Sequence, residues 1–373
     1  MDAHRRHVLA MLGAASTLLA GCSDLADEAD QSLEPNDDED SEESNADDGT
    51  DGADEDEIDE TDEETTPAWL EGGELPSYAS VLPSADALAD DETTPREYFF
   101  TAVDLATIVG TLDDDPGEGT VPDDPFLQNP IAVVSLGIYG LFALGSSPIA
   151  QVQAEAEGES DDAALVYVDG AYALYGAYDL ETARSGLEAE GYELQAEAED
   201  GADDFVVFAD DASSEVVGVT DDAFVYAFGA DQARSLAVVS AIVETNVGSQ
   251  SPAHESDTTL ETLLRAGANT GITSCLAGAG ESLTDLEPGD QVQEDDVAFD
   301  FSPFEGATGV VQGLQLAESE SNARVIVTYE SETAVDVERL ESGLGGEARS
   351  FDLETGGSAA LVTAVYGTDP IEE

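Results

Sequence analysis

The sequence contains no lysine, and only two cysteines and three histidines among its 373 residues. Its nine basic side chains are all arginine, against 86 aspartates and glutamates, which gives a formal net charge of -77. A protein that binds nucleic acid needs a basic surface to neutralise phosphates. The composition therefore excludes a nucleic-acid-binding function.

The scarcity of histidine, lysine and cysteine also limits the chemistry of the chain, because catalysis needs groups that change protonation near the working pH. Beyond residue 22, His254 is the only histidine, in the polar segment "SQSPAHESDTT", and Cys275 the only cysteine, in the strand-like "TGITSCLAGAG". A catalytic Cys275–His254 pair is the alternative to a core cysteine, which is the commoner role. We expect no enzymatic activity, no metal site and no cofactor.

Glycine-rich and acidic segments are weak candidates for phosphate-binding and cation-binding loops. "GAGES" (278–282) and "GLGGE" (343–347) lack the spacing and the lysine of a phosphate-binding loop, so we expect turns there. Acidic segments at 111–119 and 285–296 carry calcium-type oxygen ligands, but neither matches the calcium-loop pattern with its central glycine and its glutamate at the twelfth position. Solvated turns are the favoured interpretation of both, with a specific cation site as the alternative.

The amino-terminal segment is unlike the rest of the chain. It reads "RRHVLAMLGAASTLLAGC" from Arg5 to Cys22, a charged start followed by an apolar stretch too short to span a bilayer. These features are typical of a secretory signal. We predict a signal peptide over residues 1–21; a short anchor helix that is never cleaved is the alternative.

Two motifs in this leader resemble known export signals. "LLAGC" resembles a lipobox, in which the thiol of Cys22 forms a thioether to lipid and the cysteine becomes the first residue of the mature protein. The pair Arg5-Arg6 resembles a twin-arginine signal, which exports proteins that have already folded. With Cys22 attached to lipid, Cys275 has no partner for an intramolecular disulfide.

Residues 23–66 form an acidic linker. They hold 23 of the 86 acidic residues and no basic residue, so we expect disorder and an extended chain of up to roughly 150 Å. Setting these and Asp2 aside leaves 62 acidic residues and seven arginines in residues 67–373. The folded region is therefore itself acidic, and its self-repulsion is relieved only by salt, because the Debye length falls to about 3 Å at 1 M.

Arginine without lysine, small aliphatic side chains and acidic residues throughout resemble the proteins of extreme halophiles. Together with the lipobox and Arg5-Arg6, the chain resembles haloarchaeal twin-arginine-exported lipoproteins of uncharacterised family. The resemblance covers the leader and the linker. It implies a location on the extracellular face of the cell membrane, anchored through lipid on Cys22, and it implies no activity.

Residues 67–373 alternate between strand and helix signals. Paired strands are predicted over 163–178, around Asp169-Gly170, and over 309–331 and 350–367, with three strands over 204–229. Helices are predicted over 179–191, 230–245, 256–267 and 336–346. We therefore expect an α+β domain, rich in antiparallel strands with a few packed helices; two subdomains, about 67–160 and 161–373, are an alternative to one.

A strand that leads into an aspartate-capped helix recurs along the chain. "DLETARSGL" from Asp179 aligns on "DVERLESGL" from Asp336, and "AVDLATIVGTL", which contains Asp104, aligns on "AYDLETARSGL". These alignments favour a duplicated strand–helix–hairpin unit. The alternative is that any strand leading into an aspartate-capped helix looks alike.

Residues 125–154 carry no charge, and Ile131 to Gly145 is an almost uninterrupted apolar run. Its length favours a buried core helix over a membrane span. An apolar ligand groove, or a second contact with the membrane or a partner, is the alternative.

These features favour a non-enzymatic, lipid-anchored surface protein whose domain binds a protein or small-molecule partner or supports the cell envelope. The second hypothesis is a solute-binding lipoprotein that feeds a transporter, with its ligand held in a cleft. The third is a hydrolase that uses carboxylates alone, whose catalytic pair has no fixed sequence spacing.

Overall fold

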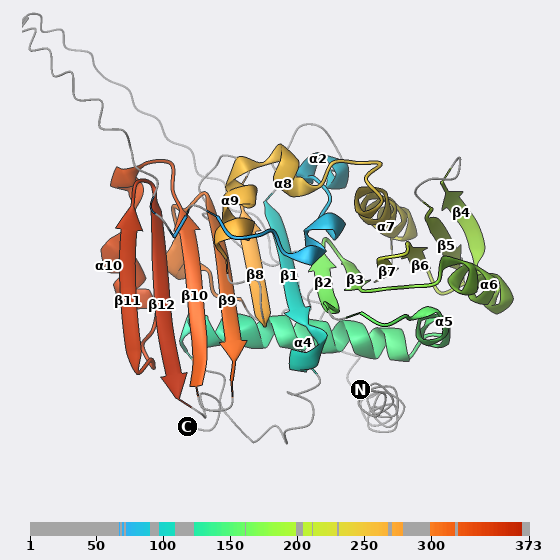
Figure 1. Ribbon diagram of the computed structural model, residues 1–373, viewed down its shortest axis with the longest axis horizontal. Helices are drawn as coiled ribbons and strands as arrows, with labels where there is room; N and C mark the ends of the chain where they lie inside the picture. The colour runs from blue at the N-terminus through green and yellow to red at the C-terminus, as the bar shows by residue number, and fades with distance from the viewer. Residues whose placement is uncertain are drawn as a thin grey trace, which may run out of the picture.

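The computed structural model places a single antiparallel sheet at the centre of the molecule, with helices on both faces (Figure 1). This arrangement confirms the α+β class. The leader, Cys22 and the acidic linker lie outside the described residues, as do 111–119 and 285–296. The structure describes residues 67, 69–70, 72–89, 97–108, 123–160, 162–198, 204–210, 212–229, 231–267, 271–278, 299–317 and 320–367.

The sheet has twelve strands in the order β11-β12-β10-β9-β8-β1-β2-β3-β7-β6-β5-β4. Among the described residues before 161, the strand is β1, which lies in the middle, so the boundary near residue 160 falls within one sheet. The strands are β1 (Tyr98–Asp104), β2 (Ala164–Val168), β3 (Ala171–Tyr175), β4 (Glu193–Glu197), β5 (Val206–Asp210), β6 (Glu215–Val219), β7 (Ala223–Phe228), β8 (Ile272–Ala277), β9 (Gly309–Leu316), β10 (Glu320–Thr328), β11 (Ser350–Gly356) and β12 (Ala359–Gly367).

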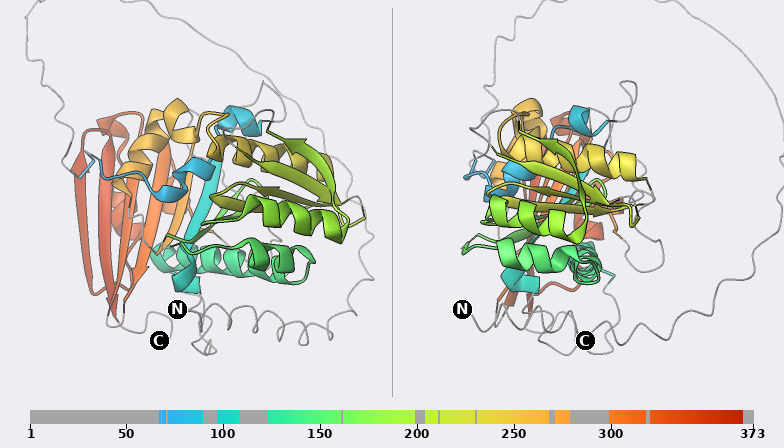
Figure 2. Two further views of the ribbon diagram at one scale, coloured as in Figure 1. Left: turned by 45° about the vertical axis from the view of Figure 1, so that its right-hand side comes forward. Right: turned by 90° about the vertical axis from the view of Figure 1, so that its right-hand side faces the viewer.

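Helices cover the sheet on both sides because most strands are apolar on both faces. In β2, Leu165 and Tyr167 join one core, whereas Val166 and Val168 join the other. Figure 2 shows α6 and α7 on opposite sides of the strands. The first core includes α4 (Pro125–Gly145), α5 (Ile149–Ala156), α6 (Leu180–Glu190) and α10 (Val337–Gly343); the second includes η1 (Ser77–Val81), α2 (Ala85–Leu88), α7 (Gln232–Asn246), α8 (Ala253–Ser256) and α9 (Thr258–Ala266).

The predicted strand pairs are confirmed. β2 and β3 form a hairpin whose turn residues, Asp169 and Gly170, both have positive φ, at 48° and 86°. That backbone suits the two-residue turns that match the twist of a hairpin. The three strands predicted over 204–229 are β5, β6 and β7, and the last two hairpins are β9–β10 and β11–β12.

Aspartate side chains begin each of the four helices predicted from the sequence. Each accepts a hydrogen bond from the backbone N–H three residues later, at 2.7 Å for Asp179, 3.1 Å for Asp231, 3.1 Å for Asp257 and 3.0 Å for Asp336. These bonds satisfy N–H groups that have no partner within the helix. They confirm the predicted helix starts, and α6 ends at Gly191, which has the expected left-handed backbone.

The strand–helix–hairpin unit occurs twice in the sheet. In one copy, the helix after β3 is α6 and the last strand of the following meander, β7, pairs with β3. In the other, the helix after β10 is α10 and the last strand, β12, pairs with β10. The first copy has an additional hairpin, β4–β5. β1 and β8 pair antiparallel near the middle of the sheet, and one copy lies on each side of this pair. The strand order is therefore approximately two-fold symmetric.

The alignment that contains Asp104 does not mark a third copy of this unit. Asp104 does cap a turn of helix at 105–108, through a 2.8 Å bond from the backbone N–H of Ala106. However, the next hairpin pairs its first strand, β2, with β1, whereas both other copies use the last strand. Local sequence similarity does not specify which strand of a hairpin returns to the sheet.

The uncharged segment forms α4, which runs along one face of the sheet beneath both halves (Figure 1). By length and composition it is the one helix in the described ranges that is apolar enough to cross a membrane, but 61% of its most apolar window is buried. The interpretation as a core helix is therefore favoured over a span. Its outer side is partly exposed, and Tyr139 has 65% of its surface accessible.

A buried polar network fixes α4 to the sheet. The side chain of Asn129 donates to the carbonyl of Asp300 at 2.9 Å and to the Gln312 side chain at 3.0 Å, and it accepts from the Asp300 N–H at 2.7 Å. Gln312, in β9, in turn donates to the carbonyl of Pro125 at 2.8 Å. Satisfied networks of this kind specify one arrangement of a core.

We predict that Gly140→Ala destabilises the fold. A Cβ at Gly140, on the buried side of α4, would overlap the ring of Tyr172, which stacks on Tyr226 with ring centroids 5.5 Å apart. Overpacking of this kind costs about 1–3 kcal/mol, more than the ~1 kcal/mol gained by replacing glycine in a helix. Urea unfolding at constant molar salt measures the change.

Gly346→Ala is the matched control for this variant, because a Cβ at Gly346 meets nothing within 4 Å. Its free energy of unfolding should stay within about 0.5 kcal/mol of the parent. Equal stability of the two variants would show that Tyr172 shifts at little cost.

Candidate functional site

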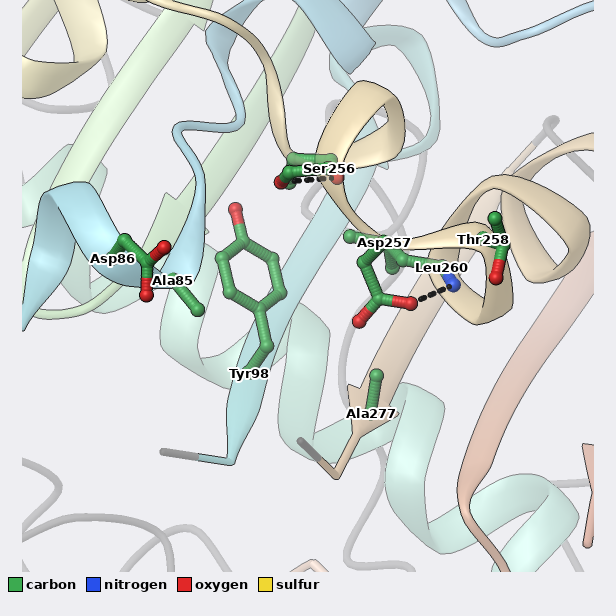
Figure 3. A pocket seen from close by; sticks show the side chains of 9 residues that line it. Ala85, Asp86, Tyr98, Ser256, Asp257, Thr258, Leu260 and Ala277 are labelled. Atoms are coloured by element: carbon green, nitrogen blue, oxygen red, sulfur yellow. Dashed lines mark hydrogen bonds between the residues drawn. The ribbon is translucent and has the colours of Figure 1, made fainter. Parts of the chain in front are cut away.

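A pocket of about 260 Å³ lies at one end of the central strand pair (Figure 3). Its base consists of Tyr98 at the start of β1 and Ala277 at the end of β8, which are directly opposite each other in the sheet. One wall is α2, and the other is α8 with the start of α9. The lining residues are Ala85, Asp86, Tyr98, Ala253, Ser256, Asp257, Thr258, Leu260 and Ala277.

Backbone contacts hold the two walls together. Pro83 and Pro252, which precede α2 and α8, form an antiparallel bridge, and the N–H of Ala253 donates to the carbonyl of Leu82 at 2.8 Å. The hydroxyl of Ser84 then caps α2. Segments far apart in the sequence are thereby joined beside the same strand ends, and this positions Asp86 opposite Asp257.

Asp257 has two roles at the pocket wall. Its Oδ1 accepts hydrogen bonds from the backbone N–H groups of Thr259 at 2.8 Å and Leu260 at 3.1 Å, and so begins α9. Its Oδ2 makes no hydrogen bond to the residues that the structure describes. Ser256, beside it, donates its hydroxyl proton to the carbonyl of Ala253 at 3.0 Å.

Tyr98 is the most unusual residue of the pocket. Only 5% of it is exposed, and its hydroxyl oxygen is buried without a hydrogen-bond partner in the described part of the chain. Its ring packs edge-on against Phe100 with centroids 6.3 Å apart. Burial raises the pKa of Tyr98 well above its ordinary value, so the phenol stays protonated and keeps its O–H donor.

The charge of the pocket is negative. Figure 3 shows the carboxylates of Asp86 and Asp257 on opposite sides of the Tyr98 ring, and no arginine is among the described residues that line the pocket. A buried hydroxyl without a partner loses the hydrogen bonds that water would give it. A ligand that offers an oxygen acceptor and a positive charge would satisfy both features of this site.

The structure places Cys275 and His254 near this end of the sheet without joining them. Cys275 is fully buried in β8, as expected of a core cysteine, and its pKa is raised first by burial and then by the charge of Asp257. The thiolate that nucleophilic chemistry requires is therefore disfavoured. His254 lies in α8, and within the described residues no hydrogen bond connects it to Cys275; its Nδ1 has no partner there.

The predicted turn at 343–347 has a role that its sequence does not indicate. The backbone N–H groups of Gly345 and Glu347 donate to the buried carboxylate of Asp124, at 3.2 Å and 3.4 Å. The same carboxylate accepts from the N–H of Phe126 at 3.1 Å and from the hydroxyl of Tyr366 at 2.8 Å. The turn thus binds an anion that belongs to the chain itself, and its donors are already occupied.

The described residues contain no group of three histidine, cysteine or acidic side chains arranged to hold a metal ion. Of the second glycine-rich segment, 278–282, only Gly278 is described. Asp86 and Tyr98 were not among the sequence-predicted site residues. A weak signal for Tyr98 exists in "REYFF", where a hydroxyl stands in an otherwise apolar strand.

Comparisons with known proteins identify no relative by sequence. No family model matches the chain, and no curated protein matches it. Among solved structures, crystal form III of TP0453 is similar with a TM-score of 0.36 and 9% identity, over 79% of this chain and 94% of that one. Crystal form IV has a TM-score of 0.34 and 10% identity, over 82% and 97%. A likeness this weak supports no functional argument.

Proposed function

We propose that this chain is a lipid-anchored protein on the outer face of the cell membrane of a halophile, where its domain binds a ligand or partner without catalysing a reaction. Cys22 in "LLAGC" supports the anchor, and the acidic linker gives the domain reach beyond the membrane surface. One lipid chain binds a membrane only marginally, so stable attachment needs a second chain or contact.

The binding role depends on one observation, the buried and unpartnered hydroxyl of Tyr98 in a pocket with two carboxylates. The phenol is a donor held in its protonated form, which suits recognition rather than proton transfer. The nearby thiol of Cys275 is fully buried. The described pocket therefore combines fixed recognition groups and lacks an activated nucleophile.

We predict that Cys22→Ser releases the protein from the membrane. Serine has no thiol with which to form a thioether, so the variant should move from the membrane fraction to the soluble fraction in a haloarchaeal host. Detergent phase separation and mass spectrometry of the amino terminus measure the change. A Cys22→Ser protein that stays in the detergent phase would contradict the lipid anchor and favour an uncleaved helix.

The paired substitution Arg5→Lys with Arg6→Lys tests the export route separately. It keeps the positive charge of the leader and removes only the arginines that a twin-arginine signal requires. The protein should then accumulate in the cytoplasm with its leader intact. Normal processing of this variant would identify the arginines as an ordinary charged start.

A solute-binding lipoprotein is the second candidate, since the described residues form a pocket that could hold a small solute. The volume of about 260 Å³ is just below the range of roughly 300–1,000 Å³ found for small-molecule sites. The single sheet differs from a two-lobed architecture with its ligand between the lobes. Thermal unfolding at molar salt with sugars, peptides, amino acids and metal ions tests this candidate, because a bound ligand raises the melting temperature.

A carboxylate hydrolase is the third hypothesis, since Asp86 and Asp257 line one pocket. Asp257 already uses one oxygen to cap α9. Turnover of a defined substrate by the purified protein, lost on Asp86→Asn, would replace the binding role with an enzymatic one.

A further inference from the structure

We propose that the Tyr98 pocket binds a small organic ammonium ion that carries one oxygen acceptor. This inference rests on the proposed binding function and specifies its ligand class. Three features of the pocket determine the class: the charge of its walls, the donor at its base and the size of its apolar interior.

The charge of the walls selects a cation. Asp86 and Asp257 approach the pocket from α2 and from the start of α9, and no arginine is among the lining residues that the structure describes. A ligand with a carboxylate or phosphate would be repelled from both sides. The region outside the pocket adds to this selection, because residues 67–373 carry 62 acidic side chains against seven arginines.

The donor at the base selects an oxygen acceptor on the same ligand. The Tyr98 hydroxyl is buried and has no partner among the described residues, so binding an acceptor would replace a missing hydrogen bond rather than exchange one. The face of the ring is also attractive to an ammonium group. The same side chain would therefore offer a donor to the ligand oxygen and an aromatic ring to the ligand cation.

The interior selects a compact ligand with an apolar body. Ala85, Ala253, Leu260 and Ala277 supply small apolar surfaces, and about 260 Å³ equals the share of roughly nine water molecules in the liquid. A peptide or an oligosaccharide is too large for this space. Methyl or methylene groups around a single charged nitrogen would fill it.

High salt strengthens the argument for an organic cation over an inorganic one. At molar salt, exposed charge pairs are largely screened, and sodium or potassium ions compete for carboxylates. Burial of apolar groups and a hydrogen bond to a buried hydroxyl do not depend on long-range attraction. A ligand that uses all three interactions keeps its affinity where simple ions do not.

The test uses three matched probes with the full-length chain in detergent at molar KCl, by isothermal titration calorimetry. Choline carries the ammonium group and a hydroxyl. Its neutral isostere, 3,3-dimethyl-1-butanol, lacks only the charge, and ethyltrimethylammonium lacks only the hydroxyl. We expect choline to bind about 5-fold or more tightly than either relative, since each lacks one recognised feature.

Two variants assign these differences to residues. Tyr98→Phe removes only the unpartnered hydroxyl and should keep the fold; it should abolish the preference for choline over ethyltrimethylammonium. Asp86→Asn should weaken the binding of choline and leave the affinity for the neutral isostere unchanged. Asp352→Asn, on the exposed face of β11, is the control and should change neither.

Equal binding of choline and its neutral isostere, or a Tyr98→Phe protein with an unchanged preference, would overturn the inference. So would the failure of every ammonium probe to bind. If a sugar or peptide then raised the melting temperature in the separate screen, the binding function would stand while the ligand class proposed for this pocket would fail.

Discussion

The folded domain is expected to lose its secondary structure when KCl is lowered from molar to tenths of molar. Residues 67–373 hold 62 acidic residues and seven arginines, so like charges dominate the surface. The Debye length grows from about 3 Å at 1 M to about 10 Å at 0.1 M. Repulsion that molar salt screens would then act between neighbouring carboxylates across the whole domain.

Seven arginines can pair with only a small share of the 62 acidic residues, so ion pairs cannot offset this repulsion. The described arginine pairs include Arg184 with Glu197, Arg234 with Asp169, and Arg339 with Glu305. Most involve partly exposed side chains, and exposed pairs contribute about 0–1 kcal/mol each. Screening by counter-ions is therefore expected to supply most of the compensation for this charge.

Far-UV circular dichroism across a KCl series measures this loss. Sucrose at low salt is the control, because it favours the compact state through exclusion from the surface without screening charge. Recovery of structure by KCl but not by sucrose would identify screening as the cause. An unchanged spectrum down to tenths of molar would contradict the halophilic interpretation.

The second large effect is expected from Asp124→Ala. This buried carboxylate joins the start of α4 to the turn at 343–347 and to Tyr366 in β12, and removing it leaves four donors without an acceptor. Hydrogen bonds to charged groups are worth about 1.5–3 kcal/mol, and unsatisfied buried donors add about 1–3 kcal/mol. We expect a loss of about 3 kcal/mol or more in the free energy of unfolding.

Urea unfolding at constant molar salt measures this loss, with two controls. Asp123→Ala removes the neighbouring, exposed aspartate and should change stability by less than about 0.5 kcal/mol. Tyr366→Phe removes one of the four donors and should cost about 1–2 kcal/mol. An Asp124→Ala protein as stable as the Asp123→Ala protein would show that water replaces the carboxylate in this cluster.

The strands and helices could be predicted because their signals are local. Apolar runs flank Asp169-Gly170, and Asp179 or Asp336 stands at the start of a helix, so short windows contain the necessary pattern. The order of the strands could not be predicted in this way. Nothing in the windows around β1 and β8 indicates that they pair, because that choice is made by the two cores that both strands complete.

The candidate site could not be predicted from the sequence for the same reason. The phenol of Tyr98 is unusual only because α2 and α8 bury it, and Pro83 and Pro252 bring those helices together over a long sequence separation. The sequence also did not predict that Asp124 accepts hydrogen bonds from the glycine-rich turn at 343–347. Asp124 directly before Pro125 is typical of a helix start, yet nothing local connects it to Gly345.

The central position of β1 has a consequence for the timing of synthesis. β1 ends at Asp104, and the strand that covers its second edge, β8, begins at Ile272 (Figure 1). Because synthesis adds about 5–20 residues per second, that apolar edge stays unpaired for many seconds before its partner strand is made. An open edge of this kind pairs readily with other chains. Export after folding, which Arg5 and Arg6 predict, would let β8 close the edge before the protein leaves the cytoplasm.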